Sequence, residues 1–278
     1  MKKLTLLLCC LVIGFTTFAQ ELKLKKRKSD ALTGTQFSKL IIDTNLSLSA
    51  REEMIFQEVK NGNIPSFLRK LSSIEINKVI NAKYYKLIIY SIPDYLSIGS
   101  DTNYFYIPTT PMLAQRIANL THTLLPTKSM VDEIYAQAII KLEPQPIPPS
   151  KAMITVPVFI VHHEMILKQL QVLGSKYQQG SLTGGNKKDI IISNKIYGQP
   201  SPRVVIYGWH KLDGKAIQPV YNKHTNTWAD YSHGIRLVSE IGYLNGKKVK
   251  LTDILKDPVL HELLSDEGII AEAKYPIN

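Results

Sequence analysis

Residues 204–238 read VVIYGWHKLDGKAIQPVYNKHTNTWADYSHGIRLV, and this stretch gives the strongest indications of both fold and chemistry. Two short apolar runs flank a polar loop, and three of the seven histidines of the chain, His210, His224 and His233, lie within it. Short apolar runs bounded by turn residues predict buried strands. Because polar groups are costly to bury without partners, the polar residues of this stretch predict a site.

Outward from this stretch, the sequence predicts an α+β fold in which a small, mostly antiparallel sheet packs with helices. Ser49 and Glu52 match a capping box at the start of a helix. Helix-start signals and apolar spacing predict helices over residues 49–60, from 65, from 111, over 127–142, 156–173 and 251–264. Apolar, β-branched and aromatic runs predict strands over residues 83–92, 95–98, 104–107, 189–192, 204–207 and 234–238.

The chain divides into segments of different character. Beyond a predicted signal peptide (1–19), we expect a basic arm and irregular lead-in (20–48), a helical and hairpin lobe (49–142) and an α+β lobe (151–278) that carries the site. Between the lobes, residues 143–150 contain four prolines and must be extended. This stretch either separates two domains or crosses the surface of one.

The first residues have the pattern of a secretory signal. Lys2 and Lys3 precede a short apolar run at residues 4–15, and small residues flank Phe18. We therefore expect cleavage before Gln20 and a periplasmic or secreted protein. No later apolar run approaches the roughly 20 residues that cross a bilayer, so no transmembrane segment is expected after cleavage.

Cysteine content and charge exclude several kinds of site. The two cysteines, Cys9 and Cys10, lie in the predicted signal, so the mature chain is expected to lack disulfides, a cysteine nucleophile and thiolate zinc sites. The net charge is +11, with basic clusters at residues 23–28 and 247–250. No nucleic-acid-binding motif accompanies them, so we interpret them as a solvated tail and a charged hairpin tip, with no nucleic-acid partner.

Two histidines of the quoted stretch are the leading catalytic candidates. His210 ends one predicted strand and His233 begins another, so antiparallel pairing of these strands as neighbours would bring the imidazoles together. Asp230 precedes His233 and could orient it, which fixes the tautomer and raises basicity. The alternative is that both histidines only cap strands through backbone hydrogen bonds.

Other residues could complete the site. His163 lies on an apolar helical face, which favours either a core position or a place beside the sheet, whereas His162 is expected to be peripheral. Asp189 follows a Gly-rich turn and could act as a base or ligand. Zinc held by His163, His210 and His233 is possible, and metal-free acid–base chemistry is the alternative. The residues expected to bind substrate lie beside these groups in the sequence: Tyr207, Trp209, Lys188, Tyr231, Arg236 and His224.

The chain also resembles an uncharacterised family of exported bacterial proteins. The motifs that carry this resemblance span most of the mature chain: Pro93-Asp94-Tyr95-Leu96, Ile98-Gly99-Ser100-Asp101, Leu125-Pro126-Thr127-Lys128, Met130-Val131-Asp132, Lys187-Lys188-Asp189, Tyr207-Gly208-Trp209-His210, Gln218-Pro219, Ala229-Asp230-Tyr231-Ser232-His233-Gly234 and Leu264-Ser265-Asp266-Glu267-Gly268. The resemblance implies a shared domain and no particular reaction.

A shorter likeness concerns the zinc D-alanyl-D-alanine carboxypeptidases. Ser232-His233-Gly234 followed by Glu240 is similar to their His and acidic residue seven apart, and Trp209-His210 is similar to their Trp-His ending. Here the order of the two elements is reversed, and the acid is Glu instead of Asp.

The residues favour an exported hydrolase that acts on an extracellular or cell-envelope polymer through a His/Asp acid–base or zinc site. One alternative is a non-catalytic module that binds glycan or peptidoglycan through Trp209, Trp228 and Tyr231. A second is a metal-free polysaccharide lyase that uses Tyr and His. A third is a scaffold stabilised by a buried His–Asp network.

Overall fold

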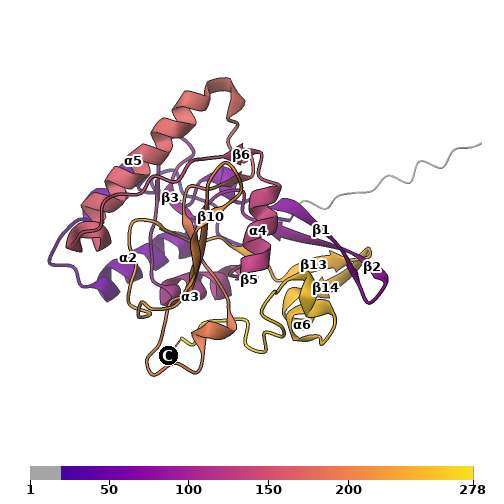
Figure 1. The fold of residues 1–278 in the computed structure, drawn as a ribbon. Coiled ribbons are helices and arrows are strands. Elements are labelled where there is room, and N and C mark those ends of the chain that lie inside the picture. The colour runs from indigo at the N-terminus through magenta and orange to yellow at the C-terminus, as the bar shows by residue number, and fades with distance from the viewer. Residues whose placement is uncertain (1–19, 278) are drawn as a thin grey trace, which may run out of the picture.

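The computed structural model describes residues 20–277, so the predicted signal peptide lies outside the described residues. The predicted α+β class is confirmed, because helices pack around small, mostly antiparallel sheets (Figure 1). The helices are α1 Gly34–Ile41, α2 Leu48–Lys60, α3 Pro111–Thr121, α4 Lys128–Ala136, α5 Val156–Leu173 and α6 Leu251–Lys256, with 3-10 turns at Ser66–Leu68, Lys151–Ile154, Gly174–Lys176, Asn194–Ile196 and Leu260–Leu263. The strands are β1 Ser72–Ile80, β2 Lys83–Ser91, β3 Ser97–Gly99, β4 Tyr104–Tyr106, β5 Thr123–Leu124, β6 Ile140–Lys141, β7 Thr183–Gly184, β8 Lys188–Ile190, β9 Ile206–His210, β10 Ala216–Tyr221, β11 His233–Gly234, β12 Val238–Ser239, β13 Ile241–Leu244 and β14 Lys247–Lys250.

Helix α2 begins two residues earlier than the predicted capping box. The Ser47 side chain accepts a hydrogen bond from the Ala50 amide and forms the N-cap. Glu52 is drawn away from Ser49 because its carboxylate accepts two hydrogen bonds from Thr110, at 2.7 Å from the amide and 2.8 Å from the hydroxyl. A long-range contact therefore replaces the predicted local one, and it joins α2 to the start of α3.

Helix α4 is shorter than predicted. It ends at Ala136, where the following Gln137 turns away and its side chain bonds to the backbone of Glu75. Ile140 then pairs with Thr183 in the short β6–β7 sheet. Tertiary pairing thus ends a helix that the apolar pattern alone would continue.

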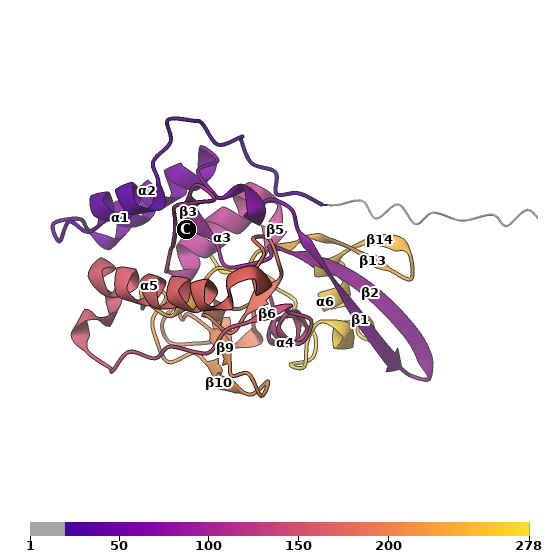
Figure 2. The same cartoon turned by 90° about the horizontal axis from the view of Figure 1, so that it is seen from above.

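The larger sheet combines strands from both predicted lobes. Its order is β14-β13-β2-β12-β5, with β1 paired to β2. The β1–β2 hairpin projects from the body with β13 and β14 beside it (Figure 2). Since β2 pairs with β12 and β13 from the C-terminal half, residues 143–150 do not separate two independent sheets. They instead cross the surface of one unit.

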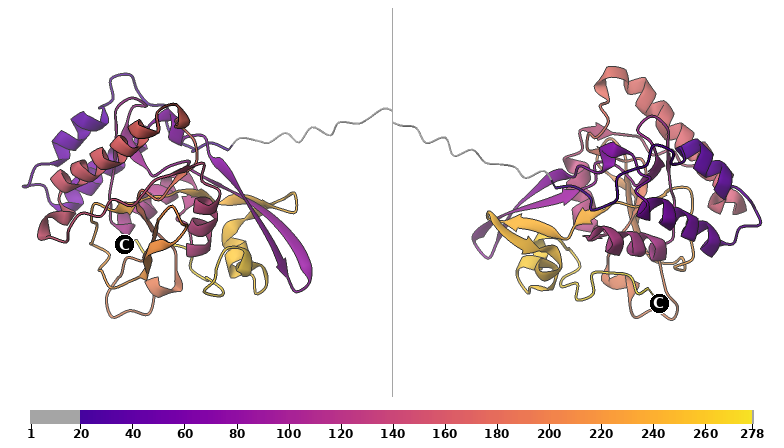
Figure 3. Two further views of the ribbon diagram at one scale, coloured as in Figure 1. Left: turned by 45° about the horizontal axis from the view of Figure 1, so that its top comes forward. Right: turned by 180° about the vertical axis from the view of Figure 1, so that it is seen from behind.

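Within the predicted arm and lead-in at residues 20–48, residues 20–33 are irregular but partly packed on the body, and helix α1 occupies Gly34–Ile41. Leu22 is buried in the core, and Glu21 forms a β-bridge with Lys70. Helix α1 follows and lies beside α5 (Figure 3). The basic residues before α1 therefore border a packed segment, although their charged ends are mostly exposed.

The smaller sheet has the order β10-β9-β8-β11 and positions the candidate site. Strands β9 and β11 were predicted to be neighbours, and this prediction is wrong, because β8 lies between them. Lys188 pairs with His233 on one side and with Gly208 on the other. Strand β10 folds back on β9 and occupies its outer edge, so β11 can reach only β8.

The predicted strand at 234–238 is divided between the two sheets. His233 and Gly234 belong to the smaller sheet, whereas Val238 and Ser239 belong to the larger one. The linking residues bond to the chain after β2, because Ile235 and Leu237 accept from Leu96 and Ile92. This crossing holds Arg236 between the two sheets.

Candidate functional site

Strand β8 carries a cation and an acid to opposite faces of the smaller sheet. Lys188 and Asp189 are adjacent, and successive side chains of a strand point to opposite sides. Asp189 lies in register with Tyr207, and Lys188 lies in register with His233. Two polar groups of side chains therefore form, one on each face.

Strand β9 changes the direction of its side chains between Tyr207 and His210. Residues three apart on a regular strand face opposite ways, yet both side chains contact Asp132, at 2.7 Å and 3.2 Å. Gly208 and Trp209 have φ angles of 103° and 56°, which break the alternation. A positive φ is uncommon for a bulky residue, and such outliers gather at functional sites.

One group, here named the His210 cluster, comprises Asp132, Asp189, Tyr207, His210, Tyr95 and Arg236. The Asp132 carboxylate accepts from the His210 Nε2, the Tyr207 hydroxyl and the Lys128 ammonium. Burial alone would raise the pKa of Asp132, but these three hydrogen bonds outweigh burial and lower it. The Tyr135 ring stacks on the His210 imidazole at 4.4 Å and restricts its rotation.

The pKa of Asp189 is shifted in the opposite direction from the pKa of Asp132. One oxygen, Oδ2, accepts from the Tyr95 hydroxyl at 2.7 Å, whereas Oδ1 has no hydrogen-bond partner among the described residues. Burial raises its pKa to about 6, although Arg236 and Tyr95 oppose the shift. Asp189 and His210 line a small cavity of about 10 Å³, together with Tyr135 and Arg236. Such a space holds roughly one water molecule.

Arg236 is the buried cation of the His210 cluster. Its side chain is fully buried, and its Nε lies 3.8 Å from the Asp189 carboxylate. Its other nitrogens donate to the carbonyls of Ile92, Pro93 and Thr183. The Tyr95 ring covers the guanidinium at 4.1 Å.

The second group, here named the His233 cluster, comprises His233, Asp230, Lys188, His162 and Lys187. The predicted orientation of His233 by Asp230 is loose, because Nε2 and the carboxylate are 4.0 Å apart. Asp230 instead accepts from the amide and hydroxyl of Ser232. Both nitrogens of His233 are buried without a partner among the described residues, and burial lowers its pKa to about 4. Burial would raise the pKa of Asp230, but His233, Lys188 and Ser232 lower it to about 2.

Lys187 and His162 are the members of the His233 cluster that the sequence did not identify. His162 was expected to be peripheral, but it is fully buried, and its Nδ1 lies 3.1 Å from the Lys187 ammonium. That ammonium also donates to the Tyr231 carbonyl at 2.6 Å. Burial lowers the pKa of Lys187 to about 7 and that of His162 to about 2. Neutral His162 therefore accepts from the lysine.

His163 lies in an aromatic environment. Its ring meets Tyr104, Phe105 and Tyr106 edge-on at 5.4–5.9 Å, which matches the core alternative. His210 and His233 lie on opposite faces of β8, so the three predicted zinc ligands have three different surroundings. Across residues 20–277, no group of three or more His, Cys, Asp or Glu side chains is placed to hold a metal.

The aromatic residues predicted to bind substrate are mostly internal. Trp209 and Tyr231 are 4% and 3% exposed, and Trp209 packs against the Lys188 ammonium at 5.1 Å. His224 and Trp228 are half-buried and stack on each other at 4.6 Å. Among the aromatic residues proposed for a glycan-binding surface, only Trp228 is therefore substantially accessible.

Asp132, Tyr135 and Tyr95 belong to the His210 environment, and the sequence did not identify them as site residues. Helical spacing gives a usable signal for two of them, because Asp132 and Tyr135 share a face of α4 with Lys128. Tyr95 comes from the start of the β3 hairpin and gives no such signal. Its contact with Asp189 joins residues 94 apart in the chain.

The chain was compared with models of known protein families, with curated proteins and with solved structures, and none of them matches it. Within residues 20–277, no helix has both the length and the apolar character needed to cross a bilayer.

Proposed function

We propose that the chain is an exported hydrolase that acts on an extracellular or cell-envelope polymer through acid–base chemistry in the His210 cluster. The observation that carries this proposal is that His210 and Asp189 line one small cavity, where His210 is paired with Asp132 and Asp189 has a raised pKa. Paired groups of this kind are typical of acid and base roles.

His210 is the base of the proposed mechanism. If its Nε2–H donates to Asp132, the imidazole is held in one tautomer and Nδ1 is left as the proton acceptor. A water molecule in the cavity would give a proton to His210 as its oxygen attacks the substrate. Asp132 would stabilise the imidazolium that forms, since its own pKa is lowered and it stays ionised.

Asp189 is the acid. With a pKa raised to about 6, it retains its proton into mildly acidic solution and can donate it to the leaving group. Gly208 lies between the two groups, and its φ of 103° favours glycine at this position. Arg236 and the Tyr95 hydroxyl then stabilise the carboxylate that remains.

A polymer would approach from the side of Asp132, where the cluster reaches the surface. The side chains of Asp132, Lys128 and Asp266 are 39%, 30% and 48% exposed and form a connected ion-pair network. Tyr207 lies beside this network and adds a hydroxyl group. The rim is therefore polar and suited to a hydrophilic chain.

The test is turnover of defined polymers by the purified protein. Peptidoglycan sacculi and a panel of extracellular polysaccharides would be incubated with the wild type and with Asp189→Asn and Asp132→Asn. Release of reducing ends or free amino groups is expected from the wild type and is expected to fall about 10²–10⁴-fold in both variants. Asp253→Asn is the matched control, because this exposed aspartate of α6 lies outside the cluster.

Full turnover by both variants would place the chemistry elsewhere. Unsaturated sugar products, seen by their ultraviolet absorbance, would favour the lyase alternative. Binding of a polymer without any product, unchanged in both variants, would favour the binding module.

A further inference from the structure

A larger cavity lies apart from both clusters, between the α1–α2 connection and the start of α5. Its volume is about 460 Å³, within the range of small-molecule sites. It shares no lining residue with the small cavity at His210. Much of its wall is apolar, including Ile41, Leu46, Leu48, Val156, Pro157 and the Trp228 ring.

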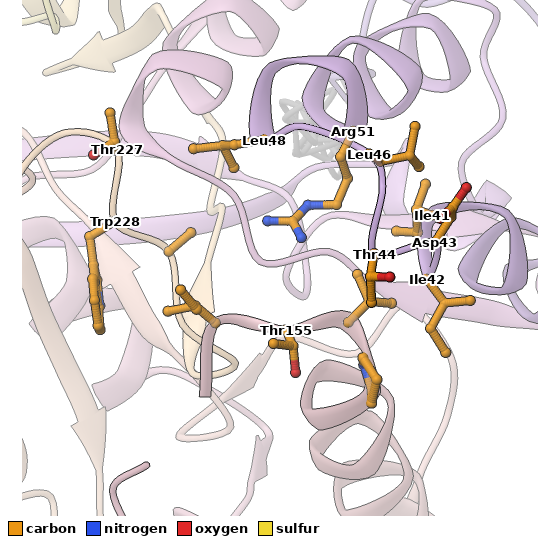
Figure 4. Close-up of a pocket in the computed structure, with 14 residues that line it drawn as sticks. Ile41, Ile42, Asp43, Thr44, Leu46, Leu48, Arg51, Thr155, Thr227 and Trp228 are labelled. Carbon is orange, nitrogen blue, oxygen red and sulfur yellow. The ribbon is translucent and has the colours of Figure 1, made fainter. Parts of the chain in front are cut away.

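One cation projects into this apolar space. Figure 4 shows the Arg51 guanidinium reaching into the cavity from α2, with Trp228 on one side and Thr44 on the other. Within residues 20–277, Arg51 makes no ion pair within 4.0 Å and no side-chain hydrogen bond. Its Cζ lies 5.7 Å from the centroid of the Phe159 ring, where a cation–π contact is favourable.

The nearby acids are engaged elsewhere. Glu52 directs its carboxylate to Thr110. The Asp43 carboxylate accepts from the Asn45 amide and side chain, and Figure 4 shows it beyond Thr44 and directed away from the guanidinium. Partial burial lowers the pKa of Arg51, but an arginine stays protonated at physiological pH. Glu52 offsets part of the Arg51 charge, but the guanidinium that faces the cavity has no paired carboxylate among the described residues.

The wall of the cavity opposite Arg51 also favours a negatively charged ligand. Helix α5 begins there with Thr155 as its N-cap, and the Thr155 hydroxyl donates to the Ala152 carbonyl instead of capping the helix. The positive end of an 18-residue helix thus borders the space. The Trp228 ring stacks on His224 and forms part of the apolar wall.

We propose that this cavity binds a monocarboxylate with an aliphatic body. The carboxylate would pair with the Arg51 guanidinium, whose planar fork matches two carboxylate oxygens. The aliphatic body would lie against Leu48, Pro157 and the Trp228 ring. An inorganic anion would leave the apolar walls unused, and an uncharged chain would leave the guanidinium unpaired.

Calorimetric titration of the purified protein with octanoate, octan-1-ol and acetate tests this proposal. Octanoate is expected to bind more tightly than the other two probes. Arg51→Gln is expected to weaken octanoate binding by about tenfold or more, as loss of a charge-assisted hydrogen bond implies. Lys60→Gln is the matched control, since it removes a cation from the exposed C-terminal end of the same helix and should leave binding unchanged.

A second variant tests the proposal independently of any change that Arg51→Gln causes in the fold. Thr44 is exposed at the cavity rim, so Thr44→Trp should block entry without removing the cation. N-acetyl-leucyl-leucine and its amide distinguish a fatty carboxylate from the carboxyl end of an apolar peptide. The proposal is overturned if the wild type does not bind octanoate, if octanol binds equally, or if neither Arg51→Gln nor Thr44→Trp weakens binding.

Discussion

The two faces of β8 carry similar side chains in different surroundings. On one face, His210 is paired with Asp132, whose side chain is 39% exposed, and Asp189 has a raised pKa. On the other, His233 is fully buried, its nitrogens lack partners among the described residues and its pKa is lowered. Both imidazoles are buried, so residue type and burial do not distinguish them, whereas pairing with a partly exposed carboxylate does.

The largest expected difference between the faces is in turnover. His210→Gln should lower the rate about 10²–10⁴-fold, because it removes the proposed base. His233→Gln should keep most of the turnover, because its ring has no described path to solvent or to the small cavity. Rates of the two variants on the same polymer would decide the matter, and an equal loss in both would contradict the assignment to one face.

The free energy of unfolding should depend strongly on Arg236, the buried cation of the His210 cluster. Arg236→Met leaves Asp189 and Asp94 buried without their guanidinium, which should reduce the free energy of unfolding by about 3–5 kcal/mol. Urea denaturation followed by circular dichroism measures the change. Arg116→Met is the matched control, because the Arg116–Glu53 pair is partly exposed and should be worth less than about 1 kcal/mol. Similar losses from both would show that burial of Arg236 is not decisive.

The His233 face should lose stability in acid. The pKa of His233 is about 4 in the folded chain and higher when unfolded, so the unfolded state binds more protons below about pH 6.5. Stability is therefore full above that pH and falls as the pH is lowered toward 4, by about 3 kcal/mol from this residue. His233→Gln should remove that part of the acid dependence in denaturation curves. A wild-type-like slope in the variant would show that His233 is not the titrating group.

The His210 face should show a smaller effect of opposite sign. The folded pKa of Asp189 is about 6, above its unfolded value, so the folded state binds more protons between about pH 4 and 6. Asp189 thus costs stability as the pH rises through that window, by about 2–3 kcal/mol at neutral pH. The free energy of unfolding of Asp189→Asn should therefore increase relative to that of the wild type as the pH rises from 4 to 8. A stability difference that is constant with pH would mean that Asp189 titrates normally.

Several elements could be predicted because their causes are local. The hairpin of β3 and β4 follows from aromatic runs around a Gly- and Asn-containing turn, and α5 from one continuous helical pattern closed by Gly174. Helix α3 begins at Pro111, as the fixed φ of proline favours. Each of these depends on residues within a few positions of one another, so the sequence contains the whole argument.

The candidate site was only partly predictable, since its members come from distant segments. Residues 188–189, 207, 210, 230 and 233 were identified because polar side chains stood beside apolar runs. Which of them meet was decided by the placement of β8 between β9 and β11, and by the positive φ angles at Gly208 and Trp209. No local pattern encodes either feature.

By itself, the sequence determined the α+β class, the positions of helices α2 to α6 and of strands β2, β3, β4, β8 and β9, and the residue types available for chemistry, because these follow from hydrophobic periodicity and short-range hydrogen bonding. Only the tertiary structure decided that a strand separates His210 from His233. It also decided that Asp132 and Tyr95 lie on the same face of the sheet as His210, and that His162 is buried against Lys187. The reason is that strand order and burial depend on contacts between residues far apart in the chain. The free energies of these contacts are set by the packed protein and not by any segment alone.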